Sequence, residues 1–260
     1  MCILFLAINQ HPDYPMIICA NRDEFHQRPT QSAHYWQDKE GILAGRDLQA
    51  GGSWLGINRR GQFAAITNIR TGGKVLENKK SRGELVTFVL EENTSGEEHN
   101  KINESWLKEQ GDSYSPFNLI YGNLEQLYCY NSVSGEQIKL STGFHSISNG
   151  AMDEIWPKMA KGEQQLEQVV KSATGINEAA LLSILNNQTR PVESELPNTG
   201  IPVEWEQLLS SIFICSENYG TRSSSIVLLG VDSSINFTEV EYDKEGNHQS
   251  LKRFNFSLHL

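Results

Sequence analysis

The sequence lacks several patterns that would point to common classes of protein. Its four cysteines, at positions 2, 19, 129 and 215, include no C-x-x-C or C-x-x-C-H spacing. This argues against a zinc ribbon, a thioredoxin-type redox site and covalently attached haem. No stretch approaches the roughly 18 apolar residues of a membrane span, and the short apolar run at the N-terminus lacks the basic region of a signal peptide. These absences favour a cytoplasmic protein without stable membrane insertion.

Positive charge is also in short supply. The 260 residues include 22 Lys and Arg against 32 Asp and Glu, a formal net charge of −10. That balance disfavours binding to nucleic acid, and the dense basic stretch at Lys79, Lys80 and Arg82 is typical of a solvated turn. The seven histidines show no paired spacing, so we predict no metal site. Without repeats or linkers, we expect a single domain over residues 1–260.

What the sequence does contain is a succession of short apolar runs separated by turn residues. These runs predict strands at Cys2–Ile8, Met16–Ala20, Trp54–Asn58, Gln62–Ile69, Phe117–Tyr121, Gln126–Tyr130, Glu136–Leu140, Phe144–Ser148, Ile212–Cys215, Ser225–Leu229, Asn236–Tyr242 and Leu251–Leu258. The four runs between Phe117 and Ser148 are expected to form one meander.

Helical spacing marks two regions. A capping box from Ser81 to Glu84 predicts a helix start, and residues 155–187 carry apolar positions at helical intervals. A polar helix or loop is expected over residues 91–111, and a proline-containing loop over Pro191–Pro202. The order of strands and helices predicts an α+β fold of four layers, αββα, in which two antiparallel sheets stack between helices.

Cys2 is the residue that most suggests chemistry. Removal of the initiator methionine would leave a cysteine that carries both a thiol and a free α-amine with an ordinary pKa of about 8. Nucleophile and base would then belong to one residue. The alternative is a buried strand cysteine with no chemical role.

Polar residues end the second predicted strand, at Asn21, Arg22, Asp23 and Glu24. If this strand forms a hairpin with the first, it returns to the vicinity of Cys2, and Arg22 would favour the thiolate there. An ordinary capped turn with a surface ion pair is the alternative for these four residues.

Three more residues at strand ends suit a site of this kind. Asn68 and Asn149 each end an apolar run and would serve as oxyanion donors, unless they are simple turn formers. Arg222 opens an apolar strand, where it would either clamp a carboxylate and tune the thiol or form a strand-end salt bridge.

Taken together, an ordered set of motifs resembles the NRDE family, whose eukaryotic members are called transport and Golgi organisation protein 2. The motifs are MCI at the start, ANRDEF at 20–25, RP at 28–29, GGSWLGI at 51–57, AAITN at 64–68, SRGELV at 81–86, FNLI at 117–120, SNG and WPK within 148–158, and YGTRSSS at 219–225. They span nearly the whole chain.

The resemblance implies an N-terminal nucleophile hydrolase architecture, similar to penicillin V acylase, bile salt hydrolase and acid ceramidase. By that resemblance Cys2 is the nucleophile, and the other catalytic positions fall on Arg22, Asp23, Asn68, Asn149 and Arg222. Those enzymes read Arg-Asn with Asp two places later, whereas Asn21 precedes Arg22 here. Residues of the matched motifs expected to bind ligand are Asn21, Glu24, Trp54 and Tyr219.

Three functions remain open at this point. The first is hydrolysis of a small amide or thioester by Cys2, which requires no cofactor. The second is a carrier for haem or a related hydrophobic metabolite, because the family is associated with haem mobilisation and with lipid and acyl-CoA metabolism. The third is an adaptor role with an inactive site.

Overall fold

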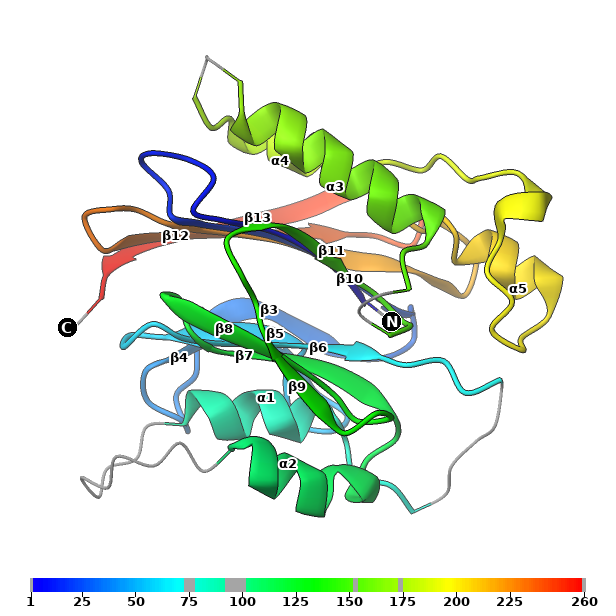
Figure 1. Cartoon of the computed structure of the whole chain (residues 1–260), viewed down its shortest axis with the longest axis horizontal. Helices are drawn as coiled ribbons and strands as arrows, with labels where there is room; N and C mark the ends of the chain where they lie inside the picture. The colour runs from blue at the N-terminus through cyan, green and yellow to red at the C-terminus, as the bar shows by residue number, and fades with distance from the viewer. Residues whose placement is uncertain (1, 73–77, 92–101, 152–153, 173–174, 259–260) are drawn as a thin grey trace. The chain divides into compact units, whose positions relative to one another are not determined.

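The computed structural model describes residues 2–72, 78–91, 102–151, 154–172 and 175–258. They form two antiparallel sheets and a small number of helices, which confirms the predicted α+β class (Figure 1). By their contacts the residues divide into two compact units. Unit 1 draws on residues 1–27, 70–74 and 141–256, and unit 2 on residues 28–69, 75–140 and 257–260. The single-domain organisation stays a prediction.

Unit 1 is built on a six-stranded sheet whose order places the N-terminal strand between partners from opposite ends of the sequence. The order is β10 (Gly143–Ile147), β1 (Cys2–Ile8), β2 (Met16–Phe25), β11 (Tyr219–Leu229), β12 (Ser234–Tyr242) and β13 (His248–Ser257). β1 runs antiparallel to both of its neighbours. The hairpin predicted for the first two strands is therefore present, and β2 extends five residues further than predicted, to include the polar end of the strand.

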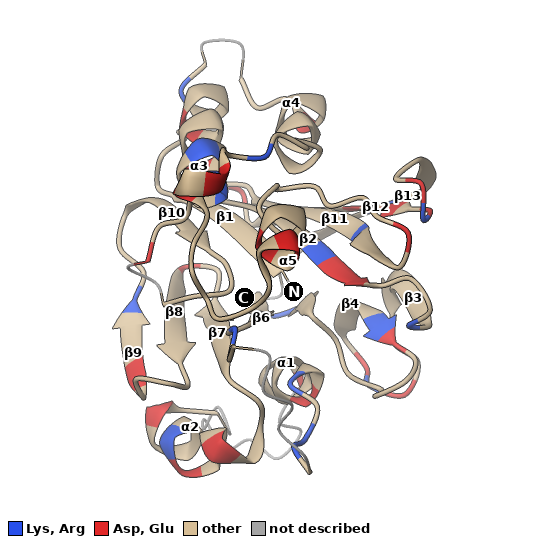
Figure 2. Cartoon of the chain, turned by 90° about the vertical axis from the view of Figure 1, so that its right-hand side faces the viewer, with Lys and Arg blue, Asp and Glu red and all other residues tan. Residues whose placement is uncertain are grey.

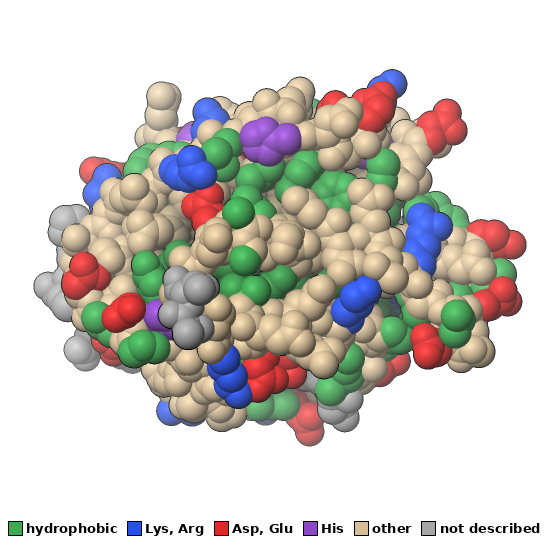
Figure 3. Space-filling model, turned by 90° about the horizontal axis from the view of Figure 1, so that it is seen from above, with side chains coloured by type: hydrophobic (Ala, Val, Ile, Leu, Met, Phe, Trp, Pro, Cys, Tyr) green, Lys and Arg blue, Asp and Glu red, His purple; other side chains and the backbone are tan. Residues whose placement is uncertain are grey.

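Helices cover one face of this sheet. α3 (Pro157–Val170) and α4 (Glu178–Leu185) contribute Leu166 and Leu181 to a buried cluster that includes Phe5 of β1. Gly162 lets α3 lie close to the strand, because a Cβ at this position would come within 2.1 Å of the Phe5 ring. Leu208, the last residue of α5 (Val203–Leu208), packs against a smaller buried cluster. Viewed from the α3 and α4 side, charges of both signs are scattered over the surface (Figure 3).

Unit 2 contains a seven-stranded sheet in simple sequential order. Its strands are β3 (Thr30–Tyr35), β4 (Ile42–Asp47), β5 (Leu55–Asn58), β6 (Gln62–Asn68), β7 (Phe117–Asn123), β8 (Gln126–Asn131) and β9 (Glu136–Lys139). The helices α1 (Gly83–Leu90) and α2 (Glu104–Gln110), with the short 3₁₀ turn η1 (Gly111–Ser113), follow β6 along the chain. Leu85, Leu90 and Leu107 from these helices pack with Phe117 and other strand residues in a buried cluster.

Several local predictions were wrong. β10 leaves the predicted meander and pairs with β1, a long-range choice that its own sequence does not encode. Residues 212–215 form no strand, because Ile212, Phe213 and Ile214 point into three different buried clusters instead of alternating between two faces.

Smaller differences concern element ends and polar segments. The capping box at Ser81 is absent, since α1 begins after Arg82 without a side-chain cap. β3 and α5 were not predicted because polar residues interrupt their apolar pattern, and β4 was not predicted because its apolar run, Ile42–Ala44, is short. The Pro191–Pro202 loop includes a short 3₁₀ turn, η2 (Glu193–Glu195). Of the polar region 91–111, residues 92–101 lie outside the described part of the chain.

Among the described residues, none belongs to a helix long and apolar enough to cross a bilayer.

Candidate active site

Cys2 begins β1 and lies directly opposite Arg22 of β2. Its neighbours Ile3 and Phe5 belong to the cluster beneath α3 and α4, so the alternation of side chains places Cys2 on the other face at the start of the strand. Only 9% of the residue is exposed. The pairing of the first two strands therefore puts a cysteine and an arginine side by side.

Asp23 joins this pair through the next strand of the sheet. β11 faces β2 with Thr221 opposite Asp23 and Ser223 opposite Arg22, and the register shifts between them. The Thr221 hydroxyl donates to Asp23 Oδ1 at 2.7 Å. Figure 2 shows the basic and acidic residues following one another along the end of β2. The hydrogen bond from Thr221 therefore orients the carboxylate of Asp23, a residue that is 1% exposed.

Asn149 approaches Cys2 from the opposite side of β1. It follows β10, whose Ile147 pairs with Leu4. The Asn149 amide Nδ2 and the Ser148 hydroxyl both donate to the Cys2 backbone carbonyl at 3.4 Å. The backbone carbonyl of Asn149 accepts a hydrogen bond from the backbone N–H of Arg70 at 3.0 Å. Four of the predicted residues, Cys2, Arg22, Asp23 and Asn149, are thus gathered at one end of the unit 1 sheet.

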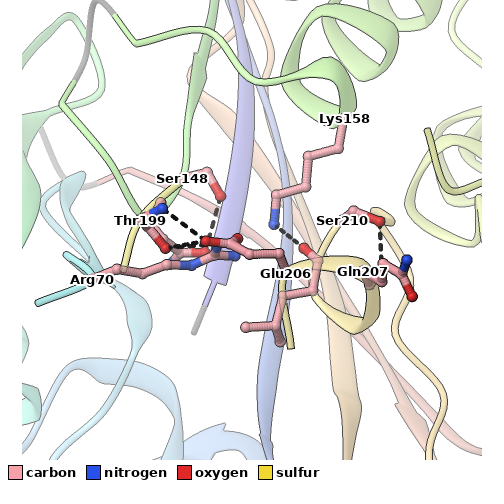
Figure 4. Close-up of polar contacts among 9 residues, drawn as sticks. Arg70, Ser148, Lys158, Thr199, Glu206, Gln207 and Ser210 are labelled. Carbon is pink, nitrogen blue, oxygen red and sulfur yellow. Dashed lines mark hydrogen bonds and ion pairs between the residues drawn. The ribbon is translucent and has the colours of Figure 1, made fainter. Parts of the chain in front are cut away.

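A second group of charged residues, which sequence analysis did not identify, lies within the same unit. Lys158, in the first turn of α3, is 4% exposed, and its Nζ donates to the Leu209 carbonyl at 3.0 Å. Arg70 and Glu206 form an ion pair whose side chains are each 5% exposed. Figure 4 shows Lys158 reaching from its helix and Arg70, Thr199 and Glu206 lying together.

The two groups influence one another electrostatically. Burial lowers the pKa of Lys158 to about 8, with nearby Arg70 acting in the same direction, and Asp23 and Cys2 opposing. Burial raises the pKa of Asp23, and the charge of Lys158 together with the Thr221 hydrogen bond opposes that rise. Lys158 therefore belongs to the electrostatic environment of Cys2.

The thiol of Cys2 is not activated in this arrangement. Burial is the main influence and raises its pKa, and the Asp23 carboxylate adds to the rise. The Arg22 charge and the Asp23 backbone N–H act in the opposite direction but are smaller. A nucleophilic Cys2 consequently needs a base to take its proton.

Three of the remaining predicted residues hold β2 and its surroundings in place. Both N–H groups of the buried Asn21 amide donate to backbone carbonyls, of Leu185 at 2.8 Å and Ile212 at 2.9 Å, which leaves no N–H for a ligand. Arg222 donates to the carbonyls of Phe25 and His26, at 3.1 and 3.2 Å. Glu24 Oε1 accepts from the backbone N–H of Phe25.

Tyr219, at the start of β11, is packed among aromatic rings. It lies edge-on to Phe25 at 5.1 Å and to Trp205 at 5.9 Å between ring centroids. Burial raises its pKa well above the ordinary value, and the Asp23 and Glu24 charges add to the rise. Its phenol is therefore neutral, and its role in ligand binding stays a prediction.

Asn68 and Trp54 belong to unit 2. Asn68 ends β6 opposite Phe117, and Trp54 is 8% exposed, with its indole over Gly45, where a Cβ would come within 2.2 Å of the ring. A role for Asn68 as oxyanion donor and for Trp54 in ligand binding both stay predictions.

Sequence analysis assigned no role to Lys158, Arg70 or Glu206. Lys158 and Thr221 stand within the motifs WPK and YGTRSSS, so the resemblance pointed to their segments without giving them roles. Arg70 lies two residues after Asn68, outside the AAITN motif. Nothing in the sequence around Glu206 distinguishes it from a surface acid. Among the described residues, no group of three or more His, Cys, Asp or Glu side chains is placed to hold a metal ion.

Comparison with solved structures finds distant matches that extend over most of the chain. A mutant conjugated bile acid hydrolase from Clostridium perfringens is 10% identical, covers 100% of this chain and 99% of its own, and has a TM-score of 0.48. The Caenorhabditis elegans ortholog of N-acylethanolamine-hydrolyzing acid amidase is 13% identical, covers 87% and 92%, and has a TM-score of 0.47.

Comparison at the level of sequence is more specific. The human Transport and Golgi organization protein 2 homolog is 31% identical over an alignment of 286 positions, which covers 99% of this chain and 99% of the human protein. The family model of Transport and Golgi organisation 2 matches residues 1–244. The resemblance inferred from the motifs is confirmed, and the chain belongs to the Transport and Golgi organisation 2 family.

Proposed function

We propose that the protein is a hydrolase of small amides or thioesters that uses Cys2 as an N-terminal nucleophile after removal of Met1. The observation that carries this proposal is the register of β1, which places Cys2 opposite Arg22 and next to Asp23 and Asn149. A buried strand cysteine without chemical function would have no need of charged neighbours, whose burial costs free energy.

In the proposed reaction the α-amine of Cys2 accepts the thiol proton. The thiolate attacks the substrate carbonyl, and the tetrahedral oxyanion is held by N–H donors, among which we place the Asn149 amide. The C–N or C–S bond then breaks, the leaving amine or thiol takes the proton, and the acyl group remains on sulfur. Water attacks this thioester, releases the carboxylic acid and returns the proton to the thiol.

The raised pKa of Cys2 supports a base within the same residue. Because the thiol is protonated at neutral pH, the free α-amine generated by methionine removal supplies what the surroundings do not. Met1 removal is therefore a requirement of the proposal. All four cysteines are free thiols in the structure, which is consistent with the reducing cytoplasm as the place of action.

The test combines intact mass with acylation. The native protein is expected to lack the mass of Met1, and an activated acyl ester such as p-nitrophenyl butyrate is expected to add one butyryl group at Cys2. Cys2→Ala should abolish both labelling and turnover. Cys215→Ala removes the least buried of the four thiols and serves as the matched control, which should leave both unchanged.

Two results would contradict the hydrolase. One is retention of Met1 in the native protein, and the other is acylation that persists in Cys2→Ala. A saturable Soret band on titration with haem, present equally in Cys2→Ala and unaccompanied by any acylation, would favour the carrier function instead.

A further inference from the structure

A small cavity in unit 1 lies beside the ion pair of Arg70 and Glu206. It encloses about 10 Å³ and is lined by Trp156, Lys158, Pro191 and Pro197 in addition to the ion pair. This volume is enough for about one water molecule or one oxygen atom of a ligand. The cavity is therefore suited to bind a single oxygen group.

Two of the residues that line the cavity, Arg70 and Trp156, each carry a hydrogen-bond donor that has no acceptor among the described residues. Arg70 Nε and Trp156 Nε1 are fully buried, and no described residue accepts a hydrogen bond from either atom. Trp156 is 4% exposed and the Arg70 side chain 5%. Such buried donors are costly unless something pairs with them. They call for an acceptor from outside the chain.

The nearby acceptors are already engaged. Glu206 Oε2 accepts from Arg70 Nη1, and Glu206 Oε1 accepts from the backbone N–H and the hydroxyl of Thr199, at 2.8 and 2.5 Å. Lys158 Nζ has the Leu209 carbonyl, which leaves two of its three N–H bonds to place. The local balance thus favours donors over acceptors.

Charge points in the same direction. Two cations face the Trp156 ring, with the Arg70 guanidinium carbon 4.6 Å and Lys158 Nζ 5.8 Å from its centroid. Glu206 offsets one of the two, and Asp23 lies close enough to Lys158 to raise its pKa. Because Arg70 and Lys158 are both cationic donors, an anionic oxygen would be favoured over a neutral one.

We propose that Arg70, Trp156 and Lys158 form a subsite for a carboxylate group of the ligand, with one carboxylate oxygen in the cavity between Arg70 Nε and Trp156 Nε1. Lys158 would add its positive charge from the wall. The Arg70 backbone N–H donates to the Asn149 backbone carbonyl, and the Asn149 side-chain amide donates to the Cys2 backbone carbonyl, so the carboxylate would belong to a molecule that also reaches Cys2. This inference deepens the proposed function, because it gives the acyl substrate an acidic group.

The experiment measures binding rather than turnover. Full-length Cys2→Ala protein labelled with ¹⁵N is titrated at pH 7 with butyrate and, separately, with butyramide as its neutral counterpart. The indole resonance of Trp156 is identified by its loss in Trp156→Phe. We expect butyrate to shift this resonance saturably and butyramide to leave it in place.

Variants then assign the donors. Arg70→Lys keeps a cation for Glu206 but lacks the Nε–H, and Lys158→Met removes the charge; each is expected to weaken butyrate binding about tenfold. Unit 2 contains a similar arrangement that serves as a control. The guanidinium carbon of Arg46 lies 4.3 Å from the centroid of the Trp36 ring, and Arg46 forms an ion pair with Asp38. Arg46→Lys and Trp36→Phe should leave the affinity unchanged.

Two results would overturn the subsite. One is an indole resonance that does not move with butyrate, which would mean that the cavity holds water only. The other is an equal response to butyramide. Because the protein tested lacks the Cys2 thiol, failure of Cys2 chemistry would not affect this result. Conversely, acylation of Cys2 by a neutral ester would survive the loss of the subsite.

Discussion

Among single residues, Lys158 offers a direct measure of the electrostatics of the site. Burial lowers its pKa from the ordinary 10.5 to about 8, so the folded state binds fewer protons than the unfolded state between these two values. The free energy of unfolding should therefore rise with pH in that window, and the favourable contribution of Lys158 is lost as the pH falls through about 8.

Urea unfolding of the wild type and of Lys158→Met at pH 7.5 and pH 10 isolates this contribution. The difference in stability between the two proteins should shift in favour of the wild type by about 2 kcal/mol over this range. Lys161→Met serves as the control for loss of a lysine from the same helix. A difference that stays constant with pH would contradict the assignment.

Cys2 reactivity tests the neighbouring charges of opposite sign. Since the Asp23 carboxylate raises the pKa of the thiol and Arg22 lowers it, Asp23→Asn should speed alkylation by iodoacetamide at pH 8, and Arg22→Met should slow it. Below the thiol pKa, each unit of change alters the thiolate fraction about tenfold. Peptide mass spectrometry separates Cys2 from the other thiols. Slower alkylation of Asp23→Asn or faster alkylation of Arg22→Met would show that the two charges do not act on this sulfur as expected.

At the scale of elements, the packing of α3 on β1 depends on one missing side chain. Replacing a helical glycine by alanine usually stabilises a helix by about 1 kcal/mol. Gly162→Ala should instead destabilise the protein by about 1–3 kcal/mol, because its Cβ would collide with the buried Phe5 ring.

Chemical denaturation of four proteins checks this explanation. In the Phe5→Leu background, the smaller side chain should remove much of the cost of Gly162→Ala, which gives a positive coupling between the two positions. Equal effects of Gly162→Ala in both backgrounds would mean that the strain lies elsewhere.

Glu206 ties the loop before α5 to that helix. Glu206 binds both the backbone N–H and the hydroxyl of Thr199 while it pairs with Arg70. Thr199→Val keeps the shape and the backbone bond but removes the hydroxyl. We expect a loss of about 1 kcal/mol and faster proteolysis within residues 188–201; unchanged cleavage would show that the hydroxyl does not hold the loop.

For the whole molecule, the order of assembly follows from the topology. β1 pairs with β10, for example Leu4 with Ile147, whereas β6 and β7 are much closer in sequence. Longer loops cost more entropy to close. In pulse-labelled refolding, amides of β6 and β7 should gain protection before those of β10, which pairs with β1; the reverse order would contradict this expectation.

The same distinction explains what the sequence revealed. The apolar run of β1 and the turn before β2 are local signals, and together they were enough to predict that Cys2 and Arg22 lie close. The second neighbour of β1 was missed, because a strand sequence does not specify a partner so far along the chain. The group formed by Lys158, Arg70 and Glu206 was missed for the same reason: three segments bring it together, and each residue alone reads as a solvated charge.

Unit 1 is formed by segments that lie far apart in the sequence. Residues 2–27 cannot complete their sheet until residues 141–256 have been synthesised. A ribosome delivers the N-terminus first, so the beginning of β1 leaves the exit tunnel long before either β10 or β11 has been made. During that interval neither of those strands can pair with β1 or β2. Enzymes that trim nascent chains therefore act on the start of the chain before the later strands of the sheet have been made.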